Sequence, residues 1–172
     1  VIFERKGKEQ SVEADKVLMA VGRRPVVEGY GLENTTIEHD ARGIVVDDNM
    51  QTNVPGVYAI GDVNARMMLA HAATMQGLHV VNHILGIPDN IRLDIMPAAI
   101  FTNPEAACVG KTEDQLKAEG VEIKVRKKMY RTNGRALAMN EAEGYIKLCV
   151  SSTDGLILSC HAFGAHSADI VQ

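Results

Sequence analysis

The chain has 172 residues, a formal net charge of −4 and a hydrophobic content of 46%, with only 4% aromatic residues. This length allows one large domain or two small ones, with a core built mainly from aliphatic side chains. The negative charge argues against nucleic acid as a general partner, and no apolar run is long enough to cross a membrane. Three well-separated cysteines suit a reducing compartment, so we expect a cytoplasmic protein.

The first 21 residues are predicted to form a hairpin and a returning strand. Gly7 lies at the expected turn, and Val17–Val21 is an apolar run that suits a buried strand. Gly29-Tyr30-Gly31 follows Pro25 rather than a strand, and no third glycine completes a G-x-G-x-x-G pattern. We therefore interpret this stretch as a loop.

Two strands are predicted in the middle of the chain. Gly43–Asp47 is the first, and Val57–Ile60 is a short apolar run that suits a buried strand. The second run ends at Gly61 and Asp62. Ligands of open α/β sheets bind at the carboxyl ends of strands, where a carboxylate can accept hydrogen bonds from sugar hydroxyls. A simple Gly-Asp turn after a strand is the alternative interpretation.

A helix is predicted from about Met68 to Leu85. Gly86 follows in a position that ends helices, and Pro88 prevents the helix from resuming. One stripe of this helix carries a spaced set of side chains: Thr74, Leu78, Val81 and Leu85. His79 and His83 have the i, i+4 spacing of metal ligands, but Val80 replaces the glutamate of H-E-x-x-H and no third ligand is evident, so we expect no metal.

From about Ile95 onward the pattern is α+β. Thr112–Gln115 is a capping box at the start of a short helix that ends at Gly120. Alternating apolar residues from Val121 to Val125 indicate a half-buried strand, and Tyr145–Val150 and Leu156–Phe163 indicate a hairpin. A basic run is interpreted as a solvated strand face, with a polyanion site as the less favoured alternative: Lys124, Arg126, Lys127, Lys128 and Arg131.

The segment Thr52–Asp62, reading TNVPGVYAIGD, resembles the second flavin-binding motif of the flavoprotein disulfide reductases. The motif is roughly T-x-x-P-x-x-Y-A-x-G-D, and each of its fixed positions is matched. The resemblance implies that Asp62, after Gly61, binds the ribityl and phosphate portion of FAD.

Further segments resemble this family in the family's order. Val17–Pro25 resembles the crossing from an NAD domain into an FAD domain, which implies that Gly22 lies near NAD. The segment Met68-Leu69-Ala70-His71 resembles the family's MLAH segment, whose backbone approaches the flavin. Phe101–Glu113 resembles the opening of the interface domain, although Phe101 stands where tyrosine is usual. Asn133–Gly144 is more similar to dihydrolipoyl dehydrogenases than to glutathione or mercuric reductases.

The resemblance implies an α/β flavin-domain portion followed by an α+β interface (dimerisation) domain, truncated at both ends. Residues 1–21 would end an NAD-binding domain, 22–94 would form the second half of an FAD-binding domain, and 95–172 an incomplete interface domain. The glycine-rich FAD loop and the redox-active Cys-x4-Cys do not occur: Cys108, Cys149 and Cys160 make no close pair. No catalytic residue of the family is therefore expected within the chain.

The parent protein implied by the resemblance is a homodimer that oxidises dihydrolipoamide and reduces NAD through FAD. Its partner would be a lipoyl-bearing protein of a 2-oxoacid dehydrogenase or glycine cleavage complex. Two alternatives remain open at this point. One is a related disulfide reductase of the mercuric or glutathione type, and the other is a non-catalytic dimerisation module. The apolar stretch from Met96 to Phe101 supports association through the C-terminal part.

Overall fold

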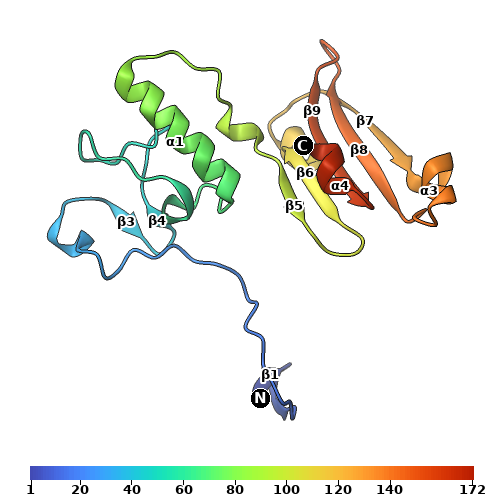
Figure 1. Cartoon of the computed structure of the whole chain (residues 1–172), viewed down its shortest axis with the longest axis horizontal. Coiled ribbons are helices and arrows are strands. Elements are labelled where there is room, and N and C mark those ends of the chain that lie inside the picture. The colour runs from blue at the N-terminus through green and yellow to red at the C-terminus, as the bar shows by residue number, and fades with distance from the viewer.

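The computed structural model describes residues 1–172 and divides the chain into three parts (Figure 1). A small hairpin lies at the N-terminal end of an extended segment. A central part holds short strands and the longest helix, and the C-terminal part is built on an antiparallel sheet. No helix is long and apolar enough to span a membrane.

The N-terminal hairpin confirms the prediction of a turn at Gly7. Strands β1 (Ile2–Arg5) and β2 (Lys8–Ser11) pair in antiparallel register. Lys6 and Gly7 both have positive φ, at 55° and 71°, which is the backbone of a tight two-residue hairpin turn. Every residue of both strands is exposed, so the hairpin is held by its ladder and not by a core.

The predicted strand Val17–Val21 is wrong. This stretch forms no strand, and its apolar side chains are exposed, with Leu18 and Val21 each at 87% of full accessibility. An extended segment becomes a strand only when a neighbour satisfies its N–H and C=O groups. No other part of the chain lies beside residues 17–21 to do so.

The central part has a small core beneath short elements. The 3-10 turn η1 (Leu32–Asn34) is followed by the paired strands β3 (His39–Asp40) and β4 (Gly43–Ile44). Leu32, Ile44 and Ala59 form the buried cluster. The predicted strand Gly43–Asp47 therefore exists only in its first two residues.

The predicted buried strand Val57–Ile60 is also wrong. Its only ladder contact is an isolated bridge between Gln51 and Tyr58, and Val57 and Ile60 are exposed while Ala59 is buried. The prediction assumed neighbouring strands on both sides, as in an open α/β sheet. Within this chain the segment pairs only with the short stretch around Gln51, where the Thr52 N–H donates to the Val57 carbonyl and the Ala59 N–H to the Met50 carbonyl. It is therefore extended but does not belong to a sheet.

Helix α1 (Ala70–Leu85) confirms the predicted helix and starts two residues later than expected. Gly86 caps it with φ at 65°, which is the left-handed conformation that ends helices. Its buried face, however, consists of Ala72, Gln76 and Val80. The residues of the predicted stripe lie instead on the exposed side of the helix: Thr74, Leu78, Val81 and Leu85.

The C-terminal part confirms the α+β prediction. Its five-stranded sheet has the order β5-β6-β9-β8-β7, and all of its pairs are antiparallel. The 3-10 turn η3 (Leu93–Ile95) leads into it. The strands are β5 (Ala98–Ile100), β6 (Ala106–Gly110), β7 (Ile123–Met129), β8 (Gly144–Ser151) and β9 (Ile157–Gly164).

Short helices cover both faces of this sheet. Helix α4 (Ser167–Val171) packs its Val171 on Ala107 and Ala162. Helix α2 (Glu113–Ala118) lies on the opposite face, where Glu113 forms an ion pair with Lys147 of β8. The predicted capping box is confirmed at the start of α2. The turn η4 (Tyr130–Thr132) and helix α3 (Gly134–Ala138) lie between β7 and β8.

Candidate functional site

The Gly-Asp pair that ends the flavin-like motif lies at the start of the 3-10 turn η2 (Gly61–Asn64). The Asp62 side chain is 46% exposed, and its Oδ2 lies 3.7 Å from a guanidinium nitrogen of Arg23. Gly61 has φ at 74°, and a Cβ on it would lie 3.2 Å from the Cβ of Ala73. Glycine thus lets η2 approach α1 closely while Asp62 faces outward with free acceptor oxygens.

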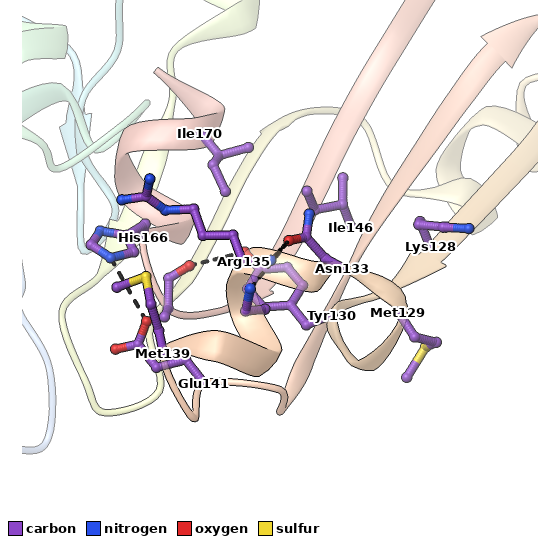
Figure 2. A pocket seen from close by; sticks show the side chains of 12 residues that line it. Lys128, Met129, Tyr130, Asn133, Arg135, Met139, Glu141, Ile146, His166 and Ile170 are labelled. Atoms are coloured by element: carbon purple, nitrogen blue, oxygen red, sulfur yellow. Dashed lines mark hydrogen bonds and ion pairs between the residues drawn. The ribbon is translucent and has the colours of Figure 1, made fainter.

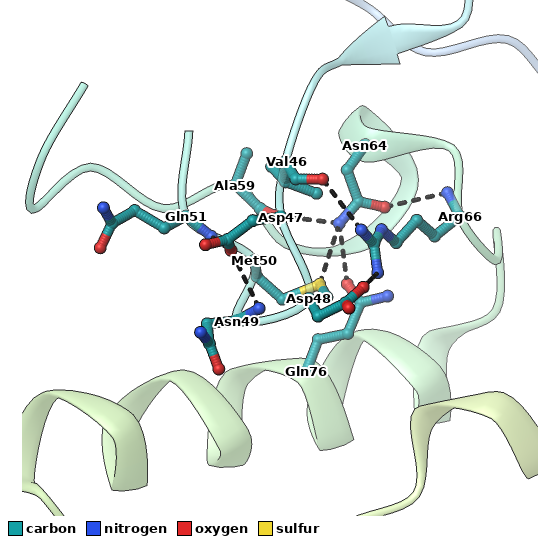
Figure 3. A network of polar contacts seen from close by, with 10 residues as sticks. All are labelled: Val46, Asp47, Asp48, Asn49, Met50, Gln51, Ala59, Asn64, Arg66 and Gln76. Atoms are coloured by element: carbon teal, nitrogen blue, oxygen red, sulfur yellow. Dashed lines mark hydrogen bonds and ion pairs between the residues drawn. The ribbon is translucent and has the colours of Figure 1, made fainter. Parts of the chain in front are cut away.

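A buried polar network fixes η2 against α1 (Figure 3). The Gly61 N–H donates to Oε1 of Gln76 at 2.8 Å, and Nδ2 of Asn64 donates to the same oxygen at 3.1 Å. Asn64 Nδ2 also donates to the Ala59 carbonyl at 2.9 Å, and Asn64 Oδ1 accepts from the Arg66 amide. These backbone partners fix which end of each side-chain amide is oxygen, so the network has one arrangement.

Sequence reasoning did not find this network. Asn64 is 7% exposed and Gln76 is 3% exposed, whereas amide side chains are ordinarily at the surface. The only signal in the sequence was the position of Gln76 at the centre of the helix, between Ala72 and Val80 on the same helix face. Had the buried face been identified correctly, a helical wheel would have shown Gln76 as a polar residue within it.

The segment expected to approach the flavin forms the entry to α1. Leu69 is the N-cap residue, and no side chain caps the helix, so the first amides of α1 keep their hydrogen-bonding capacity. Met68 and Leu69 are partly buried, and Ala70 and His71 are exposed. His71 Nε2 lies 2.7 Å from the Pro97 carbonyl, which can only accept, so Nε2 is the nitrogen that donates there.

The other expected cofactor contact, Gly22, lies in the extended segment. Its φ is 116° and the space around its Cα is open. The adjacent Arg23 is the residue that reaches Asp62, so this segment passes close to η2. The structure brings Gly61, Asp62 and the start of α1 together. Gly22 makes no contact of its own with them, and only the adjacent Arg23 reaches Asp62.

The two histidines on α1 each contact a neighbouring side chain. His79 Nδ1 lies 3.1 Å from Oδ2 of Asp89, and His83 packs edge-on against the Tyr58 ring. No group of three potential ligands occurs in the structure. Burial opposes ionisation of Asp89, but hydrogen bonds from the Ile91 amide, Asn82 and His79 outweigh it and hold the pKa of this carboxyl below its ordinary value.

A hollow of about 320 Å³ lies in the C-terminal part beside α3 and α4 (Figure 2). Tyr130 donates from its hydroxyl to the Ala165 carbonyl at 2.9 Å, and Asn133 Oδ1 caps α3. His166 lies 3.9 Å from Glu141 at the rim. None of the residues expected to bind a cofactor lines this hollow.

An outward carboxylate beside uncapped helix amides can hold a polyol through Asp62 and a carbonyl or anionic edge through the helix start. That donor and acceptor set fits FAD. The fit is helped by the close approach at Gly61, where η2 lies directly against Ala73 of α1.

Comparison with known proteins identifies the protein family. The family model of the pyridine nucleotide-disulphide oxidoreductases matches residues 3–77, and the model of the dimerisation domain of the same oxidoreductases matches residues 96–172. The chain belongs to this family. Proteins of this family are flavoproteins that use FAD and NAD(P).

The relatives within the family are dihydrolipoyl dehydrogenases. The chain is 44% identical to the dihydrolipoyl dehydrogenase of Bacillus subtilis over 100% of its own length and 37% of the relative. It is 42% identical to the mitochondrial enzyme of Caenorhabditis elegans over 96% of its own length and 34% of the relative. The chain thus spans about a third of these relatives.

Solved structures agree with the fold. LpdA from Mycobacterium tuberculosis matches 96% of the chain and 36% of its own, with a TM-score of 0.84 at 30% identity. The HOCl-induced flavoprotein disulfide reductase RclA from Escherichia coli matches 99% of the chain and 39% of its own, with a TM-score of 0.81 at 25% identity. The expected fold class, a flavin-domain portion followed by a dimerisation domain, is confirmed.

Proposed function

We propose that the chain is part of an FAD-dependent dihydrolipoyl dehydrogenase, which oxidises dihydrolipoamide to lipoamide and reduces NAD. The observation that carries this proposal is the half-exposed carboxylate of Asp62 beside the uncapped start of α1. Similarity to named dihydrolipoyl dehydrogenases over 96–100% of the chain supports the choice of substrate.

Each residue has a distinct role in this proposal. Asp62 accepts hydrogen bonds from the ribityl chain, and Gly61 allows the close approach that places it. The backbone of Met68, Leu69, Ala70 and His71 meets the flavin edge, and Gly22 lies near the nicotinamide cofactor. FAD, when bound, supplies the electron transfer between dithiol and NAD, while the protein orients and shields it. No residue of the chain is assigned to acid-base catalysis.

The same proposal divides the chain and names its partners. Residues 1–21 end an NAD-binding domain, 22–94 complete an FAD-binding domain, and 95–172 belong to the interface domain. We propose a homodimer through this last region, because Ile100 and Phe101 are 62% and 81% exposed. The protein substrate would be the lipoyl-bearing component of a 2-oxoacid dehydrogenase or glycine cleavage complex, in the cytoplasm.

The test of the site is Asp62→Ala in the full-length protein. Loss of charge-assisted hydrogen bonds should weaken FAD binding by about 1.5–3 kcal/mol, and thus by about tenfold or more. Flavin absorbance after dialysis measures the retained FAD. Asp40→Ala is the matched control, since Asp40 is an exposed aspartate that pairs with Arg42 and is not among the residues proposed to bind a cofactor. Unchanged flavin content in Asp62→Ala would remove the role given to this residue.

The substrate is tested separately with wild-type full-length protein. Reduction of NAD by dihydrolipoamide is compared with reduction of glutathione disulfide or Hg²⁺ by NADPH. A flavin-bound protein that reduces only one of the latter two would be a related disulfide reductase. The likeness to RclA, at a TM-score of 0.81, is the observation that favours this second candidate.

The 172-residue chain by itself is expected to be colourless and inactive, because the phosphate-cradling glycine loop does not occur in it. If it is a bare interaction module, it should still dimerise. Sedimentation at tens of micromolar should show a dimer that is lost when residues 95–172 are removed. A monomer without concentration dependence would contradict the assignment of the interface.

A further inference from the structure

A cavity of about 440 Å³ lies beside α1, bounded by the loop before η2 and by the segment that links α1 to β5. Its volume lies within the usual range of small-molecule sites. Asp62 and the other residues proposed to bind FAD or NAD do not line it. The cavity therefore has its own lining residues, although Met67 and Ala72 directly flank the Met68–His71 segment that is proposed to meet the flavin.

The most informative residue of this cavity is Gln76. Its side-chain oxygen is fully used by the Gly61 and Asn64 donors, and its side-chain nitrogen has no hydrogen-bond partner. The residue is only 3% exposed, and Ser159 Oγ is the sole enclosed side-chain N or O atom that lacks a partner. The Gln76 nitrogen is therefore accessible and unpaired within the protein, and it can donate to a ligand in the cavity that Gln76 lines.

Two arginines line the same wall, and each is paired with an aspartate that also lines the cavity. Arg66 donates to the Val46 carbonyl at 2.9 Å and pairs with Asp48, whose side chain is fully exposed. Arg92 pairs with Asp94, and both side chains of that pair are 64% exposed. Exposed pairs of this kind hold their partners weakly, so an incoming anion can share either guanidinium. Figure 3 shows Arg66 and Gln76 extending toward the same space.

His79 also lines the cavity and is held by Asp89, which does not line it. Asp89 accepts from Asn82 and from the Ile91 amide, and its carboxylate lies 3.1 Å from Nδ1 of His79. His79 therefore presents Nε2 as its free nitrogen. The rest of the lining is apolar: Met50, Met67, Ala72, Ile91, Leu93 and Met96.

We propose that this cavity is a binding site for a small monocarboxylate with a short alkyl chain. The carboxylate accepts from the Gln76 amide and the Arg66 guanidinium, and the alkyl chain packs against Met50 and Met96. Donors on one wall and thioether and aliphatic groups on the other define this amphiphilic class. A compact inorganic anion would leave the apolar wall without contact.

The experiment titrates hexanoate into the full-length, FAD-loaded protein and follows binding by ligand-observed NMR. A dissociation constant on the order of 1 mM is expected for a ligand of this size. Gln76→Glu keeps an acceptor oxygen for Gly61 and Asn64 but turns the free donor into an acceptor, so affinity should fall about tenfold or more. Arg66→Gln should weaken binding similarly and does not depend on the buried network.

Arg42→Gln is the matched control, because Arg42 is an exposed, aspartate-paired arginine that does not line the cavity. Hexanoate binding that persists in Arg42→Gln but weakens in both cavity variants supports the site. Absence of hexanoate binding, or equal binding in all variants, overturns it. Binding of inorganic phosphate with the affinity of hexanoate would also overturn it, because the apolar wall would then contribute nothing.

Discussion

The Gly61 amide donates a 2.8 Å hydrogen bond to Oε1 of Gln76 and so joins the loop that carries Asp62 to the middle of α1. The two residues are fifteen positions apart, and the acceptor is almost fully buried. The position of Asp62 is consequently set by a helix side chain rather than by a strand ladder. A change at Gln76 should therefore act on both stability and cofactor retention.

Gln76→Met tests this relationship. Methionine has a similar length but no strong acceptor, so the Gly61 amide and one Asn64 proton would be left unpaired, at a combined cost of about 2–4 kcal/mol. The measurement is urea denaturation of the full-length protein together with its flavin content. Gln10→Met is the control, since Gln10 lies on the exposed strand β2 and its side chain makes no hydrogen bond. Equal stability of the two variants would show that the network does not hold η2.

Gly164→Ala should strongly destabilise the C-terminal sheet. Its φ is 135°, and an added Cβ would lie 2.8 Å from both the Tyr130 ring and the Glu143 carbonyl. We expect a loss of about 3 kcal/mol from backbone strain and overpacking. Gly134→Ala is the control, because Gly134 begins α3 with open space around it and should gain up to about 1 kcal/mol. Hydrogen exchange of the β8 and β9 amides reports both changes, and similar protection in the two variants would contradict this account.

Two fully buried serines should respond oppositely to alanine. Ser167 Oγ donates to the Gly164 carbonyl at 2.7 Å, so Ser167→Ala should cost about 1–2 kcal/mol. Ser159 Oγ has no partner, so Ser159→Ala should be neutral or stabilising by up to about 1 kcal/mol. Thermal unfolding followed by circular dichroism distinguishes them. A larger loss in Ser159→Ala than in Ser167→Ala would reveal a partner for the Ser159 hydroxyl.

The stability of α2 should fall at acid pH through Glu113. Hydrogen bonds from Lys117 and then Lys147 lower the pKa of this carboxyl from its ordinary value of 4.5. A depressed folded-state pKa gives stability that is present above 4.5 and is lost as the pH falls through the folded value. Glu113→Gln should lower protection of α2 amides at neutral pH and match wild type at the acid end. Asp114 lies on the same turn but forms no ion pair, so Asp114→Asn is the control. The difference in α2 protection between this variant and wild type should not show the same dependence on pH.

Local signals in the sequence predicted the C-terminal part well. The capping box at Thr112 and the alternation in β7 act within a few residues, and the hairpin of β8 and β9 closes over one short loop. Each of these elements also finds its partner within the chain. Local pattern and tertiary packing therefore agree.

The same kind of signal failed at Val17–Val21 and Val57–Ile60. Apolar runs report that a segment prefers to be buried, but a strand also requires a neighbour whose N–H and C=O groups complete the ladder. The candidate site depended less on this error, because Gly61 and Asp62 were identified also from the match of Thr52–Asp62 to the flavin-binding motif, which does not require a strand ladder. Gln76 was missed because its importance comes from contacts with residues 12 and 15 positions away.

The extended segment between the hairpin and η1 has a practical consequence for handling the protein. Residues 13–22 make no hydrogen bond with the rest of the chain, β1 and β2 bond with each other, and the flanking Val1 and Val12 bond with each other. Exposed backbone in this form is the preferred substrate of proteases. A single cut there would separate the hairpin from the larger product, which would keep Arg23 and its ion pair with Asp62.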